Sequence, residues 1–226
     1  MRALVIGASG GIGAALANGL VARGWVVDRL SRRSDPPLDL TDEASIAAAA
    51  AAFSVRAPYG VILVASGLLH RPGMGPEKNW RQLDAAVLAE SFAVNAIGPA
   101  LVARHFLPLL DPTKRATIAF LSARVGSISD NRLGGWYGYR ASKAALNQLV
   151  RTLAIELTRT RPETICVALH PGTVDTALSV PFQRNVPAAK LFTPERSATA
   201  LLDVLDTLGP ADSGQLIDWA GERIAP

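Results

Sequence analysis

The sequence predicts an α/β domain built on a doubly wound parallel sheet with helices on both faces. Short apolar runs alternate with longer helical stretches along the whole chain, which is the pattern of repeated βα units. Residues 61–65 and 116–121 are almost entirely apolar, as expected of strands that are buried on both faces. No linker, composition shift or internal repeat divides the 226 residues, so we predict a single domain over 1–226.

The individual elements follow from hydrophobic periodicity and from helix start and stop signals. Ile12, Leu16 and Leu20 recur at helical spacing before Gly24, where a helix C-cap is expected. Further helices are predicted after an N-cap at Thr41, over 83–110, over 141–157, and from an N-cap at Thr193 to Gly209. Strands are also predicted at 4–6, 25–30, 165–169 and 215–219, with a brief strand end at 38–40.

Composition and charge exclude several classes of protein. The chain is 49% hydrophobic and 19% charged, enough to bury a core, which excludes disorder. Its net charge is +4, but the 23 basic residues are scattered, so we predict no nucleic-acid partner. No apolar run reaches the ~18–20 residues of a membrane helix and no secretory leader is visible, so we predict no membrane association. The single cysteine, Cys166, fits a cytoplasmic setting, and the three histidines lack metal-ligand spacing.

A glycine-rich turn joins the first predicted strand to the first predicted helix. Its spacing is Gly-x-x-x-Gly-x-Gly over residues 7–13. Glycines let the backbone approach a ligand closely, and the helix start beyond them offers free N–H groups to a diphosphate. A tight βα turn without a ligand is the alternative, but the place in the fold favours dinucleotide binding. The residues of the turn predicted to bind the cofactor are Gly7, Ser9, Gly10, Gly11, Ile12 and Gly13.

The end of the second predicted strand indicates which dinucleotide is bound. An NAD site usually has an acidic residue there to hold the ribose 2′-hydroxyl, but this chain has Ser31, Arg32 and Arg33. Two guanidinium groups and a hydroxyl suit a 2′-phosphate, so we predict NADP(H). Asp28 is the rival acidic residue, which keeps NAD(H) as an alternative, although it lies in the middle of the strand.

Tyr139 and Lys143 form a pair with the spacing of one helical turn. Side chains at i and i+4 share a helix face, with Cβ atoms about 5–6 Å apart. An ammonium group near a phenol stabilises the phenolate, so we expect the pKa of Tyr139 to fall from ~10 toward neutrality. Tyr139 would then serve as a general acid or base. An exposed pair at a helix start is the alternative.

Two further polar residues stand at places where chemistry is expected. Ser122 directly follows the predicted strand 116–121, at the strand end where a cofactor would lie, and its hydroxyl can donate to a developing alkoxide. Asn95 lies inside the long apolar helix, one turn before Pro99, which frees a carbonyl group nearby. Asn95 either makes core hydrogen bonds or supports a relay of waters toward Lys143.

Taken together, these motifs resemble the short-chain dehydrogenases/reductases, over essentially the whole chain. The matching segments occur in family order: the turn 7–13, Asp39-Leu40, Asn95, Ser122, Tyr139 with Lys143, and 171–176. Residues 134–137 and 170–176 resemble the C-factor-like branch. Two departures are Ile6, where the family usually has threonine, and 64–67, where it has Asn-Asn-Ala-Gly.

The resemblance implies a Rossmann fold, a catalytic tetrad and further cofactor contacts. The implied tetrad is Asn95, Ser122, Tyr139 and Lys143, and Lys143 would also hold the nicotinamide ribose. The resemblance also assigns Asp39 and Leu40 to the adenine end. The remaining expected contacts are Ala65, Ser66, Gly67, Pro171, Gly172, Val174 and Thr176, the last two at the nicotinamide.

The expected activity is NADPH-dependent reduction of a ketone or aldehyde, with alcohol oxidation as its reverse. A dinucleotide-binding signalling or sensor protein is the alternative, because C-factor-like proteins are associated with intercellular signalling. A nucleotide-sugar epimerase is disfavoured, since nothing after Trp219 would form the extra substrate domain. The substrate would be held by a loop at about 173–192, with 68–76 and 124–136. Pairing of the apolar helices from Ser91 and Ala141 would give a dimer or tetramer.

Overall fold

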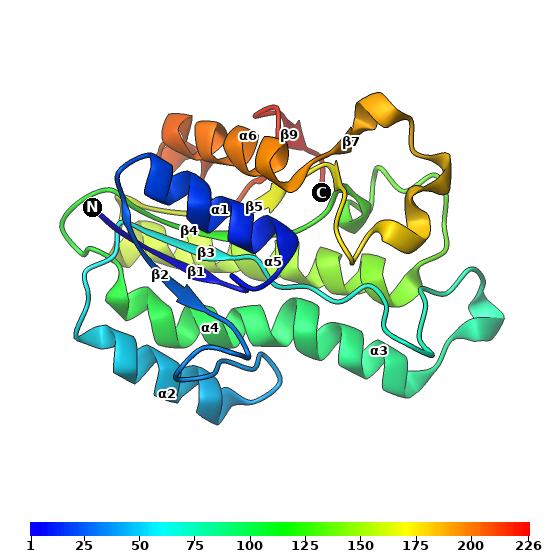
Figure 1. The fold of residues 1–226 in the computed structure, drawn as a ribbon, viewed down its shortest axis with the longest axis horizontal. Coiled ribbons are helices and arrows are strands. Elements are labelled where there is room, and N and C mark those ends of the chain that lie inside the picture. Colours follow the sequence, from blue (N-terminus) through cyan, green and yellow to red (C-terminus); the bar gives the residue numbers. More distant parts are fainter.

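Figure 1 shows the fold in a computed structural model that describes residues 1–226, apart from the side chain of Asn185. A seven-stranded sheet forms the middle layer, in the order β2-β1-β3-β4-β5-β8-β9. Its neighbouring strands pair in parallel, except that β9 runs antiparallel to β8. The predicted doubly wound sheet in a single domain is confirmed.

The bounds of the elements are close to those predicted for most of the chain. The strands are β1 (Arg2–Ile6), β2 (Val26–Leu30), β3 (Val61–Val64), β4 (Ala116–Leu121), β5 (Thr164–His170), β6 (Thr173–Val174), β7 (Leu191–Phe192), β8 (Leu216–Asp218) and β9 (Arg223–Ile224). The helices are α1 (Gly11–Ala22), α2 (Glu43–Ser54), α3 (Ala85–Phe92), α4 (Gly98–Phe106), α5 (Tyr137–Thr160) and α6 (Pro194–Thr207).

Helices cover both faces of the sheet (Figure 1). Helices α1 and α6 pack together on one face, and α2, α4 and α5 cover the other. The strands serve both layers, since Leu4 and Ile6 of β1 join a core cluster with Phe106, while Val5 joins a second cluster with Leu16. Alternate side chains of one strand therefore enter opposite cores, which explains why the strand sequences are apolar throughout.

The segment after β2 differs from the prediction. Leu38, where a brief strand end was expected, makes a single backbone hydrogen bond to Ser31 O and belongs to no strand. Pro36 and Pro37 precede it and have no N–H to offer a ladder.

The N-cap of α2 also differs from the prediction. It is Asp42, whose carboxylate accepts the N–H of Ala44, rather than Thr41. The hydroxyl and the N–H of Thr41 instead donate to Asp39 Oδ1, so Thr41 belongs to the turn before the helix.

The long helix predicted at 83–110 is real but interrupted. Helices α3 and α4 are joined by a π-helical turn, η2 (Ala93–Ile97), and a short 3₁₀ turn follows α4. The stretch Ala85–Leu109 is long and apolar enough to cross a membrane by length and composition, contrary to our expectation that no stretch qualifies. In the fold, α3, η2 and α4 all pack against α5, and α4 also packs against α2.

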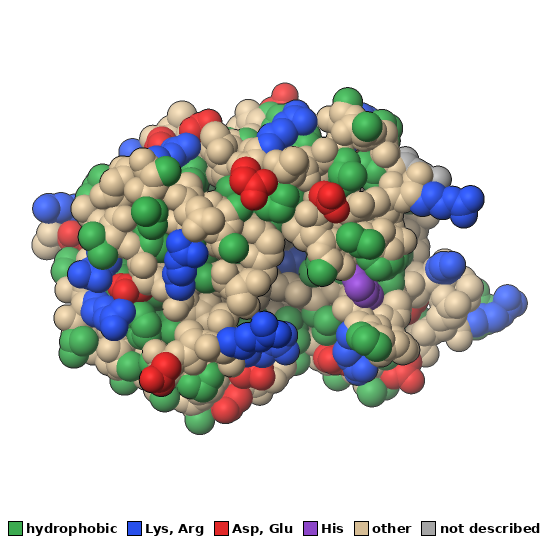
Figure 2. All heavy atoms as spheres, viewed as in Figure 1, with side chains coloured by type: hydrophobic (Ala, Val, Ile, Leu, Met, Phe, Trp, Pro, Cys, Tyr) green, Lys and Arg blue, Asp and Glu red, His purple; other side chains and the backbone are tan. Residues whose placement is uncertain are grey.

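The carboxyl ends of the central strands meet at one edge of the sheet. The loops that follow β3, β4 and β5 gather at this end, on the right of Figure 1. The segment after β5 contains the small β6–β7 pair and a 3₁₀ turn, η5 (Val180–Asn185). Figure 2 shows that the surface is hollowed between the main body and this loop end. This is where a doubly wound fold places its ligand.

Candidate active site

The turn between β1 and α1 is packed too closely for side chains at two of its glycines. Gly7 has a φ of +86°, and a Cβ there would lie 2.6 Å from Ser66 Oγ and 2.8 Å from the carbonyl carbon of Ala65. A Cβ on Gly13 would lie 2.2 Å from Gly7 O. These contacts bring the loop after β3 against the glycine turn and hold α1 close to its own strand.

The start of α1 suits an anionic group. Gly10 is the N-cap and has no side chain to bond the first N–H groups, and the first turn carries no acidic residue. Those N–H groups and the positive end of the helix dipole fit the diphosphate of a dinucleotide. A Cβ on Gly11 would lie 2.7 Å from Thr176 Cγ2, so Thr176 reaches this turn from the segment after β5.

The turn that carries Ser31, Arg32 and Arg33 lies beside the glycine turn. Leu30 O accepts the N–H of Gly7 at 2.8 Å, which joins the end of β2 to the end of β1. Arg32 and Arg33 are exposed at this edge. Hydrogen bonds from Thr41 hold the pKa of Asp39 below its usual value, and Arg32 adds to the effect. Arg32 and Asp39 therefore lie near each other at the same end of the site.

Asp28, the acidic residue that could have held a ribose 2′-hydroxyl, is instead hydrogen-bonded by three other side chains. Its carboxylate accepts hydrogen bonds from Tyr59 at 2.8 Å, Arg56 at 2.6 Å and Arg2 at 3.1 Å. Burial opposes ionisation here, but these three donors together lower the pKa of Asp28. Asp28 therefore stabilises the fold at the sheet edge.

Helix α5 positions the predicted tyrosine and lysine. Lys143 is buried, its Nζ donates to Leu121 O at 2.8 Å, and it lies 5.9 Å from the centroid of the Tyr139 ring. This contact places Lys143 at the end of β4, immediately before Ser122. Tyr137, in contrast, is 38% exposed and lines a surface hollow formed mainly by residues 125–135.

The titration behaviour of this pair differs from the expectation. Burial raises the pKa of Tyr139 to about 12 and lowers the pKa of Lys143 to about 8. A lowered tyrosine pKa is therefore wrong for this structure, because removal from water disfavours the charged form of each group. At neutral pH Tyr139 is a neutral phenol, which is the form that donates a proton.

Ser122 and Asn147 are directly bonded. Ser122 is buried at the end of β4, and its N–H donates to Leu169 O of the neighbouring strand. Its hydroxyl donates to Asn147 Oδ1 at 2.6 Å. Asn147 was not predicted, although it continues the i, i+4 spacing of Tyr139 and Lys143 by one more turn.

Asn95 lies in the π-helical turn η2 and is completely buried. Its Oδ1 accepts the N–H of Leu68 at 2.8 Å, and its Nδ2 donates to Leu68 O and to Ser142 Oγ. A Cβ on Gly67 would lie 3.6 Å from Asn95 Oδ1 and 3.7 Å from Lys143 Nζ. Asn95 therefore makes core hydrogen bonds, and Gly67 lies between its side chain and Lys143; the water relay toward Lys143 stays a prediction.

A distant carboxylate holds the start of α5. Trp136, the N-cap, has a φ of +54° and no side-chain cap. Glu77 instead accepts the N–H of Gly138 at 3.1 Å through Oε2, and its backbone oxygen accepts the N–H of Trp136. A negative charge is favourable at a helix N-terminus. The helix therefore begins at Tyr137, before the predicted 141, and Tyr139 lies in its first turn.

Aromatic rings extend from Tyr139 to the loops at this end. Trp136 packs edge-to-face on Tyr139, with ring centroids 6.2 Å apart, and on Phe182 of η5 at 5.1 Å. Phe182 in turn packs on His70, whose Nε2 lies 3.0 Å from Ala177 O. The three loops expected to hold substrate thus meet through these rings.

The other predicted contacts lie around the same edge. Leu40 packs against Gly98 of α4, where a Cβ would lie 2.6 Å from Leu40 Cβ. Gly172 has a φ of +80° and packs on Phe192, and Val174 pairs with Phe192 across β6 and β7. Both departures, at Ile6 and at 64–67, leave the fold intact.

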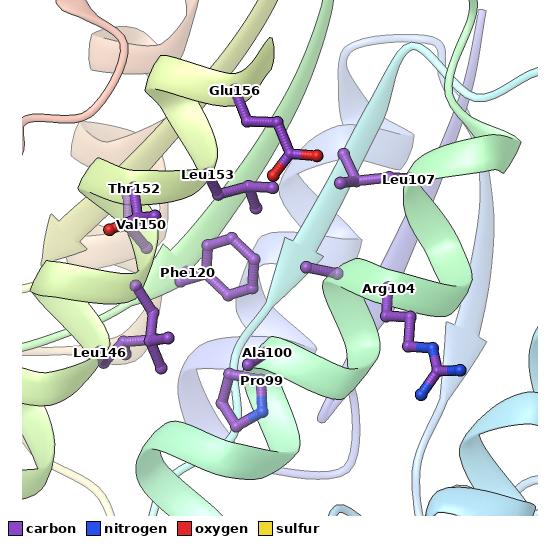
Figure 3. Close-up of a pocket in the computed structure, with 12 residues that line it drawn as sticks. Pro99, Ala100, Arg104, Leu107, Phe120, Leu146, Val150, Thr152, Leu153 and Glu156 are labelled. Carbon is purple, nitrogen blue, oxygen red and sulfur yellow. The ribbon is translucent and has the colours of Figure 1, made fainter.

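An open cavity of about 440 Å³ lies elsewhere, between α4 and α5 (Figure 3). Pro99 and Ala100 of α4 face Leu146 and Leu153 of α5 across it, and Phe120 of β4 lies between them. None of the predicted site residues lines this cavity. It therefore belongs to the outer surface of the helix layer.

Sequence comparison identifies the family. A profile described as short chain dehydrogenase matches residues 1–186. The chain belongs to this family. It is similar to the C-signal protein of Myxococcus xanthus, with 38% identity over 143 residues, covering 63% of this chain and 80% of that protein. It is also 32% identical to a 1-hydroxy-2-glutathionyl-2-methyl-3-butene dehydrogenase of Rhodococcus over 80% of this chain and 75% of that protein.

Solved structures of short-chain dehydrogenases agree in fold over the full length. An NADPH-bound carbonyl reductase from chicken fatty liver has a TM-score of 0.85 and 28% identity, covering 100% of this chain and 98% of its own. A Burkholderia multivorans short-chain dehydrogenase/reductase with bound NADP has a TM-score of 0.83 and 26% identity, covering 100% and 99%. This chain is therefore a short-chain oxidoreductase that uses a nicotinamide dinucleotide.

Proposed function

We propose that this short-chain dehydrogenase is an NADPH-dependent carbonyl reductase with Tyr139 as its general acid. The observation that carries the proposal is the face of α5. It holds Tyr139 in its first turn and Lys143 one turn later, with Lys143 bonded to the strand end that carries Ser122. These groups lie at the carboxyl edge of the sheet, together with the glycine turn.

Reduction of a carbonyl group leaves negative charge on its oxygen, and this chain has two hydroxyl groups for it. NADPH supplies the hydride when bound. Ser122 would donate a hydrogen bond to the oxygen, and Tyr139 would transfer its proton to it. An alkoxide is a stronger base than a phenolate, so this transfer is favourable for a phenol with a pKa of about 12. Lys143 would stabilise the phenolate left behind, with Asn95 supporting a water relay that restores the proton.

The residues proposed to hold NADPH follow the edge of the sheet. The α1 N-terminus would bind the diphosphate, and Lys143 the nicotinamide ribose. Arg32 and Arg33 would bind the 2′-phosphate. The three hydrogen bonds that the Asp28 carboxylate accepts support NADP(H) over NAD(H), because that carboxylate is then not available to bind a ribose 2′-hydroxyl.

The substrate is proposed to be a ketone or aldehyde with an apolar group. The support is the ring contact of Trp136 with both Tyr139 and Phe182, which provides an apolar wall beside the proton donor. The loop 173–192 would close over such a group. We place the reaction in the cytoplasm.

Steady-state oxidation of NADPH against a panel of carbonyl compounds tests this function. We expect turnover on apolar ketones or aldehydes, and a loss of about 10²–10⁴-fold in kcat for Tyr139→Phe. Tyr137→Phe is the matched control and should keep the full rate. Full activity of the Tyr139→Phe variant would refute the mechanism.

A second candidate is a dinucleotide-binding signalling or sensor protein. The similarity to the C-signal protein of Myxococcus xanthus favours it. This candidate predicts tight NADP binding without turnover of any carbonyl. It also predicts a cellular phenotype that Tyr139→Phe leaves unchanged.

We also propose a homodimer or homotetramer formed through α4 and α5. The support is the open apolar cavity between these helices and the partial exposure of Leu149 and Ile155 on α5. A second copy would bury these side chains.

A further inference from the structure

Asn147 lies on the same face of α5 as the proposed proton donor. It follows Lys143 by one helical turn and Tyr139 by two, so the three side chains form a single row. Its Oδ1 accepts a hydrogen bond from the hydroxyl of Ser122 at 2.6 Å. Its Nδ2 is buried and has no hydrogen-bond partner among the described residues. A buried amide nitrogen whose two N–H donors are both unused, next to a reactive hydroxyl, calls for an explanation.

The position of this amide relative to Ser122 is closely fixed. The turn η4 (Arg124–Gly126) follows Ser122 and packs against α5. A Cβ on Gly126 would lie 2.9 Å from Lys143 Cβ and 3.0 Å from Asn147 Nδ2. The backbone of Ser122 is tied to β5 through Leu169 O. Only two features of this contact can therefore still vary: the torsion angle of the Ser122 hydroxyl and the orientation of the Asn147 amide.

These two features decide where the proton of Ser122 points. A serine hydroxyl has one proton and two acceptor sites, and here its proton is given to Asn147 Oδ1. In that arrangement it cannot donate to a substrate oxygen. Turning the amide by half a revolution presents Nδ2 to Ser122 Oγ, and the two orientations have nearly the same shape. The hydroxyl then accepts from Asn147, and its proton is free.

We infer that Asn147 is a positioning residue for carbonyl reduction, whose amide donates to Ser122 Oγ and so directs the Ser122 proton to the substrate oxygen. This inference rests on the proposed function. It gives Nδ2 a hydrogen-bond partner, while Oδ1 takes the former place of Nδ2 beside Gly126, and it explains why an amide follows the tyrosine and lysine on this face. Asn147 acts through Ser122 and makes no contact with substrate itself.

Asn147→Asp is the sharpest test, because an ionised carboxylate has nearly the same shape but only accepts. The carboxylate would keep accepting the hydrogen bond from the Ser122 hydroxyl, so this hydroxyl could not donate to the substrate. We expect kcat for carbonyl reduction to fall about 10–100-fold with little change in KM or in the Kd for NADPH. We also expect kcat to recover as the pH falls and the new carboxyl is protonated, because it can then donate. A merely structural role would not produce that pH profile.

Two further variants and a control complete the test. Asn147→Leu cannot hydrogen-bond and should lose rate without recovery at low pH, while its Tm reports any loss of folding. In a Ser122→Ala background, Asn147→Asp should change kcat less than twofold, because the residue acts through that hydroxyl. Gln148→Glu makes the same amide-to-acid change on the next, exposed residue and should keep the full rate.

The outcomes separate this inference from the function on which it rests. If Tyr139→Phe and Ser122→Ala lose activity but Asn147→Asp keeps the wild-type kcat, the positioning role is refuted and the reductase stands. Additive losses in the double variant with Ser122→Ala would also refute it. If the wild-type protein turns over no carbonyl compound, the proposed function and this inference both fall.

Discussion

Replacement of Arg32 by alanine should weaken NADPH binding without affecting NADH. A guanidinium–phosphate hydrogen bond contributes about 1.5–3 kcal/mol, which corresponds to about 10–100-fold in an equilibrium constant. Arg32 is exposed and lies near Asp39, whose negative charge offsets part of its own. We therefore expect the low end of that range, an increase of about tenfold in the KM for NADPH.

The assay is steady-state kinetics with both cofactors against one carbonyl substrate. Arg29→Ala is the matched control, because this arginine lies on β2, just before the turn that carries Arg32, and donates to Asn18 Oδ1 on α1 at 2.8 Å. Its KM for NADPH should stay within twofold of the wild-type value. An unchanged KM for NADPH in Arg32→Ala, or an equal rise for NADH, would refute the assignment of this turn to the 2′-phosphate.

Further predictions concern proton transfer, stability, substrate and assembly. The reduction rate should fall as pH rises through about 8, because buried Lys143 loses its charge there. Lys143→Arg should shift this fall to higher pH. An unchanged pH profile in that variant would contradict the role of Lys143 in stabilising the phenolate. Tyr59→Phe should lower the free energy of unfolding in urea by about 1–3 kcal/mol, since it removes a hydrogen bond to the buried carboxylate of Asp28; an unchanged midpoint would argue against it. Phe182→Ala should raise the KM for bulky apolar ketones and leave the Kd for NADPH unchanged, whereas an equal KM would mean the ring is away from substrate. Leu149→Glu should be monomeric in light scattering, because it places a charge in the proposed interface. A monomeric wild-type protein would refute the oligomer proposal.

The strands and the main helices could be predicted because burial on two sheet faces constrains their sequences directly. Each central strand must be apolar on both sides, as Leu4 and Val5 show by entering opposite cores. The Thr193 N-cap of α6 was also predictable, since its hydroxyl accepts the N–H of Arg196 within the same turn.

Features that depend on distant residues could not be predicted. The start of α5 is fixed by Glu77, which lies 61 residues before Gly138 in the chain. Local sequence carries no signal of that contact. The direction of the pKa shift of Tyr139 could not be predicted either, because it depends on how deeply the fold buries the ring.

The candidate site was predictable by residue type but not by hydrogen bonding. Ser122, Tyr139 and Lys143 stand out by their place on a strand end or by their spacing. The partner of Ser122 could be inferred only by extending the helical row to Asn147, and nothing in the sequence gives the direction of that hydrogen bond. Donor and acceptor roles follow from tertiary contacts, which the sequence pattern does not contain.

The structure of the complex with NADPH is the most direct test of the central claim. The account predicts the diphosphate at the α1 N-terminus and the nicotinamide ring facing Tyr139. The hydroxyl groups of Tyr139 and Ser122 should both lie within hydrogen-bond reach of one substrate oxygen beside that ring. A nicotinamide bound away from α5, or a Tyr139 hydroxyl directed into solvent, would contradict the account.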